Sequence, residues 1–447
     1  MELRDILGTD FVELEEMLAE RERRAEVQSR LLAAQDGGLL CLSLNMAGPV
    51  KRFPLLLRGY REGRRRTEAA LDRAGVSWKF LEERLERAGP CAFYQVRESV
   101  PLPEVKEILC GVEDAGPLGR LLDLDLLRPD GEKISRREAG RPPRRCLLCG
   151  EEAAVCGRSR RHSVEELQRE TVRLLESGFS AQWADRVASR AVRAMLYEVS
   201  VTPKPGLVDR RNSGAHRDMD FFTFLDSIAV LGPWFRRFCL LGFSSAERED
   251  AVLFSSARSL GQEAEEAMRS ATEGVNTHQG LIFSLGLLCV AAGQLYALRL
   301  PGGGEASPGV EDLCRRAAAL GVHAPLPAGW EKDRSPGGAR GEAAGGFSSV
   351  RRWVLPALRQ AESLEEGGRR ALLALLSQVE DANLLRRGGR TALEETARRA
   401  RRVLAAPEGD FPKELRDFDQ AMIQANLSPG GCADLLAVGY FLLFMES

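Results

Sequence analysis

The stretch TPKPGLVDRRNSGAHRDMDFFTF, residues 202–224, decides how the chain is organised. It separates two apolar segments with helical spacing, residues 183–199 before it and residues 221–238 after it. Because Pro203 and Pro205 lack a backbone N–H and have a fixed φ, the first helix must end here. We therefore expect a stiff polar loop between two helices.

The loop concentrates polar side chains, since Asp209, Asn212, His216 and Asp218 follow one another within ten residues. Carboxylate oxygens are the ligands that magnesium prefers, and an imidazole can move a proton near neutral pH. Together with Lys204, this combination suits a hard cation that carries phosphates. An alternative stays open, because Asp and Asn commonly bond their own backbone in turns and would then only cap the loop.

Length and charge limit the class of protein. A chain of 447 residues is too long for one ordinary core, so two domains are expected. Its 63 basic and 65 acidic residues nearly cancel, which argues against nucleic acid as a partner. No stretch reaches the roughly 18 uninterrupted apolar residues of a membrane span, and the N-terminus lacks the pattern of a signal peptide. We expect a cytoplasmic protein whose ten cysteines are reduced unless a metal holds them.

The first half mixes helical and strand patterns. These patterns predict helices over residues 12–35 and 81–89 and strands over residues 39–44 and 91–99. Arg21 and Arg24 lie on the polar face of the first helix. Lys51 follows the first strand in a Gly-Pro turn, which is a common way to approach a phosphate.

A second acidic motif lies in LLDLDLL, where alternation puts Asp123 and Asp125 on the same face of a strand. Two carboxylates placed in this way form a clamp for a divalent metal of the type used in nucleotidyl transfer. Arg120 stands beside them. The alternative is a half-exposed edge strand.

A cysteine cluster follows this strand. Cys146 and Cys149 have C-x2-C spacing, and Cys156 and His162 come next. Four such ligands could hold a tetrahedral zinc, and the alternative is a set of reduced thiols packed beside an arginine-rich loop. The chain then becomes helical, and we expect the domain boundary near Gly178, with domains over residues 1–177 and 178–447.

Further polar clusters lie in the helical second half. Glu265, Met268 and Thr272 recur at spacings of three and four residues, so they share one face of a helix. Asn276, Thr277 and His278 stand at the start of a strongly apolar helix, where unpaired backbone N–H groups form an anion site; a plain core helix is the alternative. The Gly- and Pro-rich residues 301–346 predict a long mobile connection, which we interpret as a lid that contributes Arg340 beside Glu342.

The last two clusters lie near the C-terminus. The segment QVEDANLLRRGG combines Asp381, Asn383 and Arg387 over about one and a half helical turns. In NLSPGGCADLL, Ser428 and Gly430 precede an apolar helix. This arrangement fits a helix start that is approached closely by a phosphate, and an ordinary capped helix is the default alternative.

These motifs resemble two known families. The second half resembles the triphosphoribosyl-dephospho-coenzyme A synthases of citrate lyase maturation, through TPKPGLVDRRNSGAHRDM, ATEGVNTHQGLIFSLGLL, GARGEA, EDANLLRRGG and NLSPGGCADLLA. The first half resembles the citrate lyase holo-acyl-carrier-protein synthases, which are phosphoribosyl-dephospho-coenzyme A transferases, through RERRAEVQ, NMAGPVK, PLGRLLDLDLL, ISRRE and PPRRCLLCGEEAAVCGRSRRH. The resemblance implies a fusion of both enzymes.

The resemblance implies a two-step route. The second domain would join the 2′-OH of 3′-dephospho-coenzyme A to the ribose C1 of ATP and expel adenine. The first domain would then transfer the product to a serine of the citrate lyase acyl carrier protein, its γ subunit, with release of pyrophosphate.

The positions of the residues within these motifs suggest chemical roles, and the residue types agree with the route that the resemblance implies. Displacing adenine builds oxocarbenium-like charge, which Glu265 or Asp209 would stabilise while a carboxylate accepts the hydroxyl proton, with His216 and His278 as further catalytic candidates. Magnesium, bound by Asp218 and Asp381, would hold the triphosphate together with Arg340 and Arg387. The other predicted substrate-binding residues of this domain are Lys204, Asn212, Asn276, Thr277, Glu342, Asn383, Ser428 and Gly430.

In the first domain Asp123 and Asp125 would carry magnesium for in-line attack on the α-phosphate, while Arg120 and Lys51 steady its charge. Arg21 and Arg24 would bind substrate. Two other functions stay open: maturation of malonate decarboxylase, and a zinc-knuckle module that binds nucleic acid. The expected architecture is an α+β nucleotidyltransferase-type domain followed by a mainly all-α domain.

Overall fold

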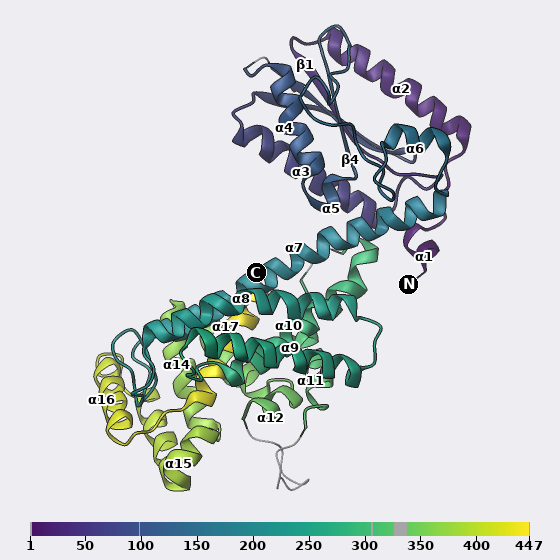
Figure 1. Ribbon diagram of the computed structural model, residues 1–447. Helices are drawn as coiled ribbons and strands as arrows, with labels where there is room; N and C mark the ends of the chain where they lie inside the picture. Colours follow the sequence, from purple (N-terminus) through teal and green to yellow (C-terminus); the bar gives the residue numbers. More distant parts are fainter. Residues whose placement is uncertain (1, 98, 305–306, 326–337, 447) are drawn as a thin grey trace. The chain divides into compact units, whose positions relative to one another are not determined.

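The computed structural model describes residues 2–97, 99–304, 307–325 and 338–446 (Figure 1). The chain forms two compact units, one of Met1–Phe179 with Arg299–Glu305 and the other of Ser180–Leu298 with Ala306–Ser447. The long helix α7 (Val164–Ser200) contributes residues to both units.

The first unit is built on a four-stranded antiparallel sheet with the strand order β2-β3-β1-β4. Its strands are β1 (Gly38–Leu44), β2 (Trp78–Glu86), β3 (Gly89–Val96) and β4 (Leu122–Leu127). The strands predicted over residues 39–44 and 91–99 are confirmed as β1 and β3. The helix predicted over residues 81–89 is wrong, because this segment lies mostly in β2. Its Leu, Glu and Arg residues favour a helix, but pairing with β3 overrides that preference.

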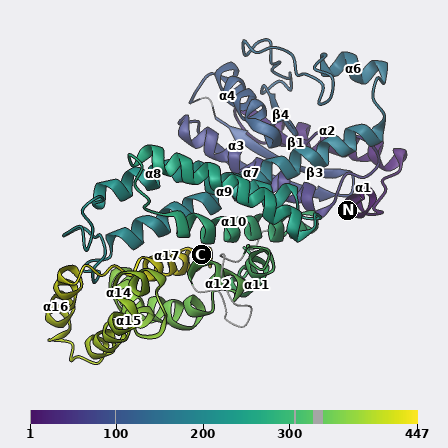
Figure 2. The ribbon, with the colours of Figure 1, turned by 60° about the horizontal axis from the view of Figure 1, so that its bottom comes forward.

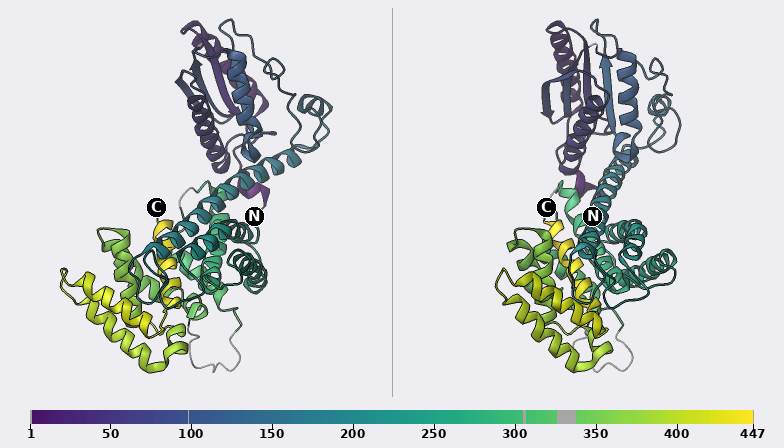
Figure 3. Two further views of the ribbon diagram at one scale, coloured as in Figure 1. Left: turned by 60° about the vertical axis from the view of Figure 1, so that its left-hand side comes forward. Right: turned by 90° about the vertical axis from the view of Figure 1, so that its left-hand side faces the viewer.

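Helices cover both faces of this sheet (Figures 1 and 3). One face packs on α3 (Pro54–Arg73) and α4 (Leu102–Asp114), through side chains such as Leu42 and Leu124. The opposite face, which includes Leu127, packs on α2 (Leu14–Ala33). Because side chains alternate along a strand, Asp123 and Asp125 lie on the α2 face.

The regular secondary structure in the described residues of the second unit is all helical. Figure 2 shows α8, α9 and α10 lying side by side. The helices after α7 are α8 (Phe221–Ser244), α9 (Asp250–Ala271), α10 (Gln279–Arg299), α11 (Val310–Gly321), α12 (Gly338–Ala344), α13 (Leu355–Gln360), α14 (Leu364–Gln378), α15 (Ala382–Leu404), α16 (Phe411–Gln424) and α17 (Gly430–Met445). The predicted order, an α+β region followed by an all-helical region, is confirmed.

The centre of the second unit is apolar. The segment Gln279–Gly302 is long and apolar enough to cross a membrane by composition, yet 78% of its most apolar window is buried inside the protein. The apolar helix α17 is buried along almost its whole length. Two such helices act as the core around which the others pack.

The long mobile connection predicted over residues 301–346 is wrong for its described residues. Residues 310–321 form α11, and Arg340 and Glu342 lie on α12. Residues 326–337, which the lid prediction also covered, lie outside the described residues.

Candidate active sites

The two carboxylates predicted in the first unit share one environment. Asp123 pairs in register with Ser43, and Asp125 with Cys41, so both project from the same face of β4. Burial and the neighbouring charge of Asp125 raise the pKa of Asp123. Lys133 Nζ lies 2.5 Å from Asp125 Oδ1. The face therefore concentrates negative charge that a cation can balance.

An arginine that the sequence did not single out faces this carboxylate pair. Arg144 Nη2 lies 3.8 Å from Asp123 Oδ1 and 2.8 Å from Glu113 Oε1. Glu113 is buried and also accepts a hydrogen bond from the backbone N–H of Leu124 at 2.9 Å. The predicted Arg120 instead donates to the carbonyl oxygen of Cys146 at 3.0 Å, so it braces the cysteine loop.

The three predicted basic residues of the first unit form one group. Burial, followed by the charges of Arg21 and Arg24, lowers the pKa of Lys51. Arg24 Nη2 donates to the carbonyl oxygen of Gly89 at 2.7 Å. A partly buried ammonium beside two guanidinium groups is an attractive environment for an anion.

The predicted cysteine cluster is assembled. The ligand atoms of Cys146, Cys149, Cys156 and His162 all lie within 4.8 Å of one another. The sulfurs of Cys149 and Cys156 are 3.8 Å apart. The buried His162 Nε2 finds no hydrogen-bond partner in the described part of the chain. This cluster could hold a metal ion.

In the second unit the predicted residues converge on a cavity of about 310 Å³. It lies where α10, α15 and α17 begin and where the polar loop of residues 207–219 passes. The start of a helix favours an anion where its N–H groups are free, but Asp381 already accepts from the N–H groups of Asn383, Leu384 and Cys432 at the starts of α15 and α17. The predicted residues that line the cavity are His216, Asp218, Asn276, Thr277, His278, Asn383, Arg387, Ser428 and Gly430.

Both histidines in this cavity are kept neutral. Burial and the charge of Arg387 lower the pKa of His216, whose Nε2 lies 2.8 Å from Ser428 Oγ. Burial lowers the pKa of His278 to about 3. His278 Nδ1 lies 2.7 Å from Ser227 Oγ, and its buried Nε2 has no bonding partner among the described residues. A neutral imidazole can donate or accept one proton.

Two carboxyl groups in the cavity were missed by the sequence prediction. Burial and the nearby charge of Glu198 raise the pKa of Asp434 well above its usual range. A Cβ atom on Gly280 would lie 2.3 Å from Asp434 Oδ2, so a larger residue there would displace the Asp434 carboxyl. Glu198 forms a buried ion pair with Lys204. A lone Asp inside the apolar helix α17 was the available signal for this site.

Several predicted residues are used to build the loop and do not line this cavity. Asp209 Oδ1 accepts from the N–H groups of Arg211 at 2.7 Å and Asn212 at 3.2 Å, and Oδ2 accepts from that of Lys204 at 3.0 Å. Asn212 Nδ2 donates to Asp419 Oδ2 at 3.1 Å. The geometry therefore favours the capped-loop alternative over a catalytic Asp209, because its oxygens are already bonded to the backbone.

Asp381 likewise caps helices. Its Oδ1 accepts from the N–H of Asn383 at 2.8 Å, and its Oδ2 accepts from the N–H of Cys432 at 2.8 Å. These bonds tie α15 to α17, so the magnesium prediction for Asp381 is not supported. Glu342 is bonded to Ser349 and does not line this cavity.

Glu265 and Arg340 lie apart from Arg387, in a second cavity of about 230 Å³. Gln279 is the residue that lines both cavities. Because Arg340 and Arg387 line different cavities, the arrangement does not favour the prediction that both bind the same triphosphate.

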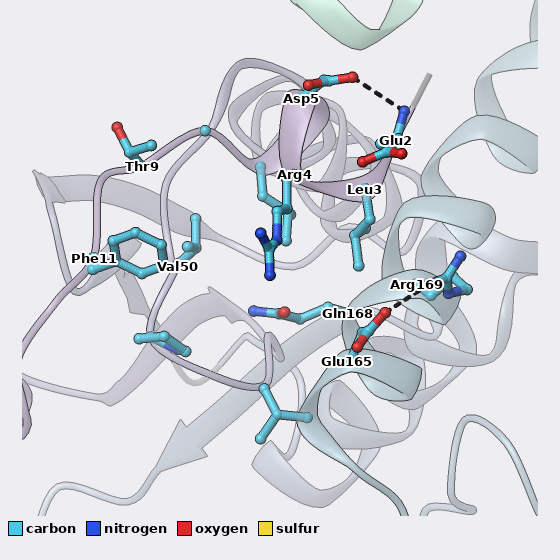
Figure 4. A pocket seen from close by; sticks show the side chains of 14 residues that line it. Glu2, Leu3, Arg4, Asp5, Thr9, Phe11, Val50, Glu165, Gln168 and Arg169 are labelled. Carbon is cyan, nitrogen blue, oxygen red and sulfur yellow. Dashed lines mark hydrogen bonds and ion pairs between the residues drawn. The ribbon is translucent and has the colours of Figure 1, made fainter.

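A third hollow, of about 1270 Å³, lies in the first unit between the N-terminal segment and the first turns of α7. Figure 4 shows Arg4 and Gln168 pointing into it. Glu165 and Arg169 on its wall pair with each other at 2.7 Å. It contains none of the predicted site residues.

Both parts of the chain match established protein families. Residues 12–178 match the family model of CitX, the apo-citrate lyase phosphoribosyl-dephospho-CoA transferase. Residues 184–324 and 330–447 match the model of CitG, the ATP:dephospho-CoA triphosphoribosyl transferase. The first match speaks against malonate decarboxylase maturation and against a nucleic-acid-binding module.

Relatives of full length carry both parts in the same order. Protein CitXG of Haemophilus influenzae is 32% identical over 97% of this chain and 96% of that protein. Protein CitXG of Leuconostoc mesenteroides is 30% identical over 97% of each. The 2-(5''-triphosphoribosyl)-3'-dephosphocoenzyme-A synthase of Pectobacterium atrosepticum is 42% identical over 57% of this chain and 88% of that protein. The chain therefore belongs to the CitX and CitG families, joined in one polypeptide as they are in the CitXG proteins.

Proposed function

We propose that this bifunctional transferase makes the triphosphoribosyl-dephospho-CoA precursor in the cavity at the start of α10 and α17, and attaches it at the Asp123 and Asp125 face of β4. One observation carries the proposal: motifs far apart in the sequence meet in one cavity that combines carboxyl groups, neutral imidazoles and helix starts. Both reactions are assigned to the cytoplasm.

The cavity residues suit displacement of adenine from ribose C1. Arg387, together with the helix-start N–H groups that Asp381 does not occupy, would bind the triphosphate of ATP. Asp434 would stabilise the positive charge that develops on the sugar, because its carboxyl lies deep in the cavity. The unpartnered Nε2 of His278 is available to the leaving adenine or to a ribose hydroxyl.

Magnesium fits the acidic residues of both sites. In the synthase cavity Asp218 and Asp434 would hold it, since both carboxyl groups line this cavity. In the transferase site Asp123 and Asp125 would hold it. The ion would supply charge neutralisation for the phosphate oxygens.

The transferase site would act on the α-phosphate of the precursor. A serine hydroxyl of the citrate lyase acyl carrier protein would attack in line, and pyrophosphate would leave. Arg144, held by Glu113 and lying beside Asp123, would steady the charge on the phosphate. The basic group of Arg21, Arg24 and Lys51 would bind the pyrophosphate end.

The cysteine cluster is proposed to hold structural zinc. When two sulfurs bind one tetrahedral zinc at about 2.3 Å, they lie about 3.8 Å apart, which is the separation of the Cys149 and Cys156 sulfurs. The unpartnered His162 Nε2 completes the ligand set. Arg120 and Arg144 tie this loop to β4, so the metal would fix the geometry of the transferase site.

Replacing Cys149 with Ser is expected to remove zinc and to lower carrier transfer by about 10-fold or more, because the loop that positions Arg144 loses its anchor. Zinc content by mass spectrometry and carrier loading by intact mass would be measured together. Leu148→Ala, at an exposed neighbouring position, should retain both zinc and transfer. A wild-type protein that contains no zinc and transfers normally would refute the assignment.

The synthase reaction is tested by incubating the purified chain with ATP, magnesium and 3′-dephospho-CoA and by separating the products chromatographically. Free adenine should form only when 3′-dephospho-CoA is present. Formation of ADP or AMP in place of adenine would mean that the cavity performs phosphate chemistry.

A further inference from the structure

The cavity of about 230 Å³ that contains Glu265 has an aromatic wall. It lies mainly between α9 and α10 and is lined by Phe238, Phe254 and Phe283. Two helical glycines leave room for one of these rings, that of Phe238, which is only 2% exposed. A Cβ on Gly286 would lie 3.1 Å from Phe238 Cζ, and a Cβ on Gly261 would lie 3.9 Å from the same atom. The ring of Phe283 is half-buried and lines the cavity, so it offers a face on which a planar base can stack.

The rim of this cavity is polar and carries basic side chains. Arg258 comes from α9 and Arg340 from α12, and both line the cavity. Guanidinium groups bind phosphate oxygens in a forked geometry. Aromatic rings beside two arginines therefore match the two ends of an adenosine 5′-pyrophosphate, its base and its diphosphate.

The two cavities of the second unit meet at one side chain. Gln279, the first residue of α10, lines both. Its Nε2 donates to Glu265 Oε2 at 2.9 Å, and Arg269 Nη2 lies 3.3 Å from the same oxygen. Glu265 is thus held at the boundary between the two cavities.

The acidic residues distinguish the cavities. Among the described residues, the larger one is lined by the carboxyl groups of Glu198, Asp218 and Asp434, whereas the smaller one is lined by one carboxyl, that of Glu265. A triphosphate that carries magnesium needs carboxylate ligands for its metal, and a diphosphate ester held by arginines does not.

On the basis of the proposed function, we propose that the aromatic cavity binds the adenosine 5′-pyrophosphate part of 3′-dephospho-CoA, while the larger cavity binds magnesium ATP. The two riboses then meet beside Gln279 and Glu265. The 2′-oxygen of dephospho-CoA forms a bond to C1 of the ATP ribose, and the bond from C1 to adenine breaks. Adenine leaves with that electron pair and takes up a proton at the same ring nitrogen, while Glu265 accepts the proton of the 2′-hydroxyl.

Filling the aromatic cavity tests this assignment. Gly261→Met places a side chain over Phe238 from a helical position, where glycine is the weaker helix former, so α9 should persist. With full-length protein and adenine release as the readout, we expect the KM for 3′-dephospho-CoA to rise about 10-fold or more, equivalent to about 1.4 kcal/mol of binding. The KM for ATP should stay within about twofold.

A control and a second variant keep the outcome clear. Ser259→Met lies at an exposed position of the same helix outside the cavity and should leave both KM values unchanged. Arg258→Ala, also at an exposed position, removes a rim cation without filling space and should raise the KM for 3′-dephospho-CoA. Thermal melting by circular dichroism confirms that each variant is folded.

Three results would contradict the assignment of the two cavities, and they can be told apart. A rise in the KM for ATP alone would reverse the assignment, and unchanged KM values in folded Gly261→Met and Arg258→Ala would show that the aromatic cavity binds neither nucleotide. If wild-type protein releases no adenine, the proposed synthase reaction itself fails, and that result is separate from any effect of the variants.

Discussion

Replacing Asp123 with Asn should abolish carrier modification while adenine release from ATP and 3′-dephospho-CoA continues at the wild-type rate. Asp123 and Asp125 project from one face of β4, and burial together with this pairing raises the pKa of Asp123. Removing one of the two carboxylates proposed to hold magnesium should lower the transfer rate by at least about 100-fold, the usual effect of losing one electrostatic stabiliser of a transition state. Intact mass of the carrier protein and chromatography of adenine give the two rates.

Because the pKa of Asp123 is raised, the prediction extends to the pH dependence of carrier transfer and to the melting temperature of the variant. Transfer needs the ionised carboxylate, so activity should fall on acidification at a pH above the value of about 3.9 typical of a free Asp. A carboxyl whose pKa is raised on folding opposes folding when it is ionised, so Asp123→Asn should not lower the Tm at pH 7. Asp130→Asn, in the exposed turn after β4, is the matched control. Normal carrier loading by Asp123→Asn would remove this residue from the transferase site.

The second large effect is expected at Asp434. Asp434→Asn should lower adenine release by at least about 100-fold, because the cavity loses the carboxylate assigned to the developing charge on ribose and to magnesium. The same variant, supplied with preformed triphosphoribosyl-dephospho-CoA, should load the carrier at the wild-type rate. The two half-reactions are measured separately on one protein, so carrier loading shows that the first unit is intact, and thermal melting by circular dichroism checks that the second unit is folded.

Stability provides an independent check on Asp434. Because burial raises its pKa well above the usual range, the ionised form costs folding free energy at pH 7, and the Asn variant should melt at the same or a higher temperature. Asp417→Asn, exposed on α16, should change neither activity nor Tm. Wild-type adenine release by folded Asp434→Asn would show that the chemistry lies elsewhere.

The sequence predicted the parts of the synthase cavity that depend on local signals. Two groups of residues lie at the starts of long apolar helices, namely Asn276 to His278 and Ser428 with Gly430. Such positions can be predicted from capping and helix-start patterns in the sequence. The alternation around Asp123 and Asp125 likewise fixed their common strand face.

The failures have two physical causes. Asp209 and Asp381 carry the residue types of a metal site, but the same types cap loops and helices, and only the folded backbone distinguishes the two uses. Asp434 and Arg144 were missed because their roles depend on long-range packing, against Gly280 in one case and Glu113 in the other. The edge strand β2 was misread because its composition favours a helix.

The most direct test of the account combines both reactions in one vessel. Purified chain, magnesium, ATP, 3′-dephospho-CoA and the apo form of the citrate lyase acyl carrier protein are incubated, and carrier mass, adenine and pyrophosphate are followed together. The account predicts that each carrier gains one phosphoribosyl-dephospho-CoA group as equal amounts of adenine and pyrophosphate appear. A carrier that remains unmodified while ATP is consumed, or a carrier modified without release of adenine, would contradict it.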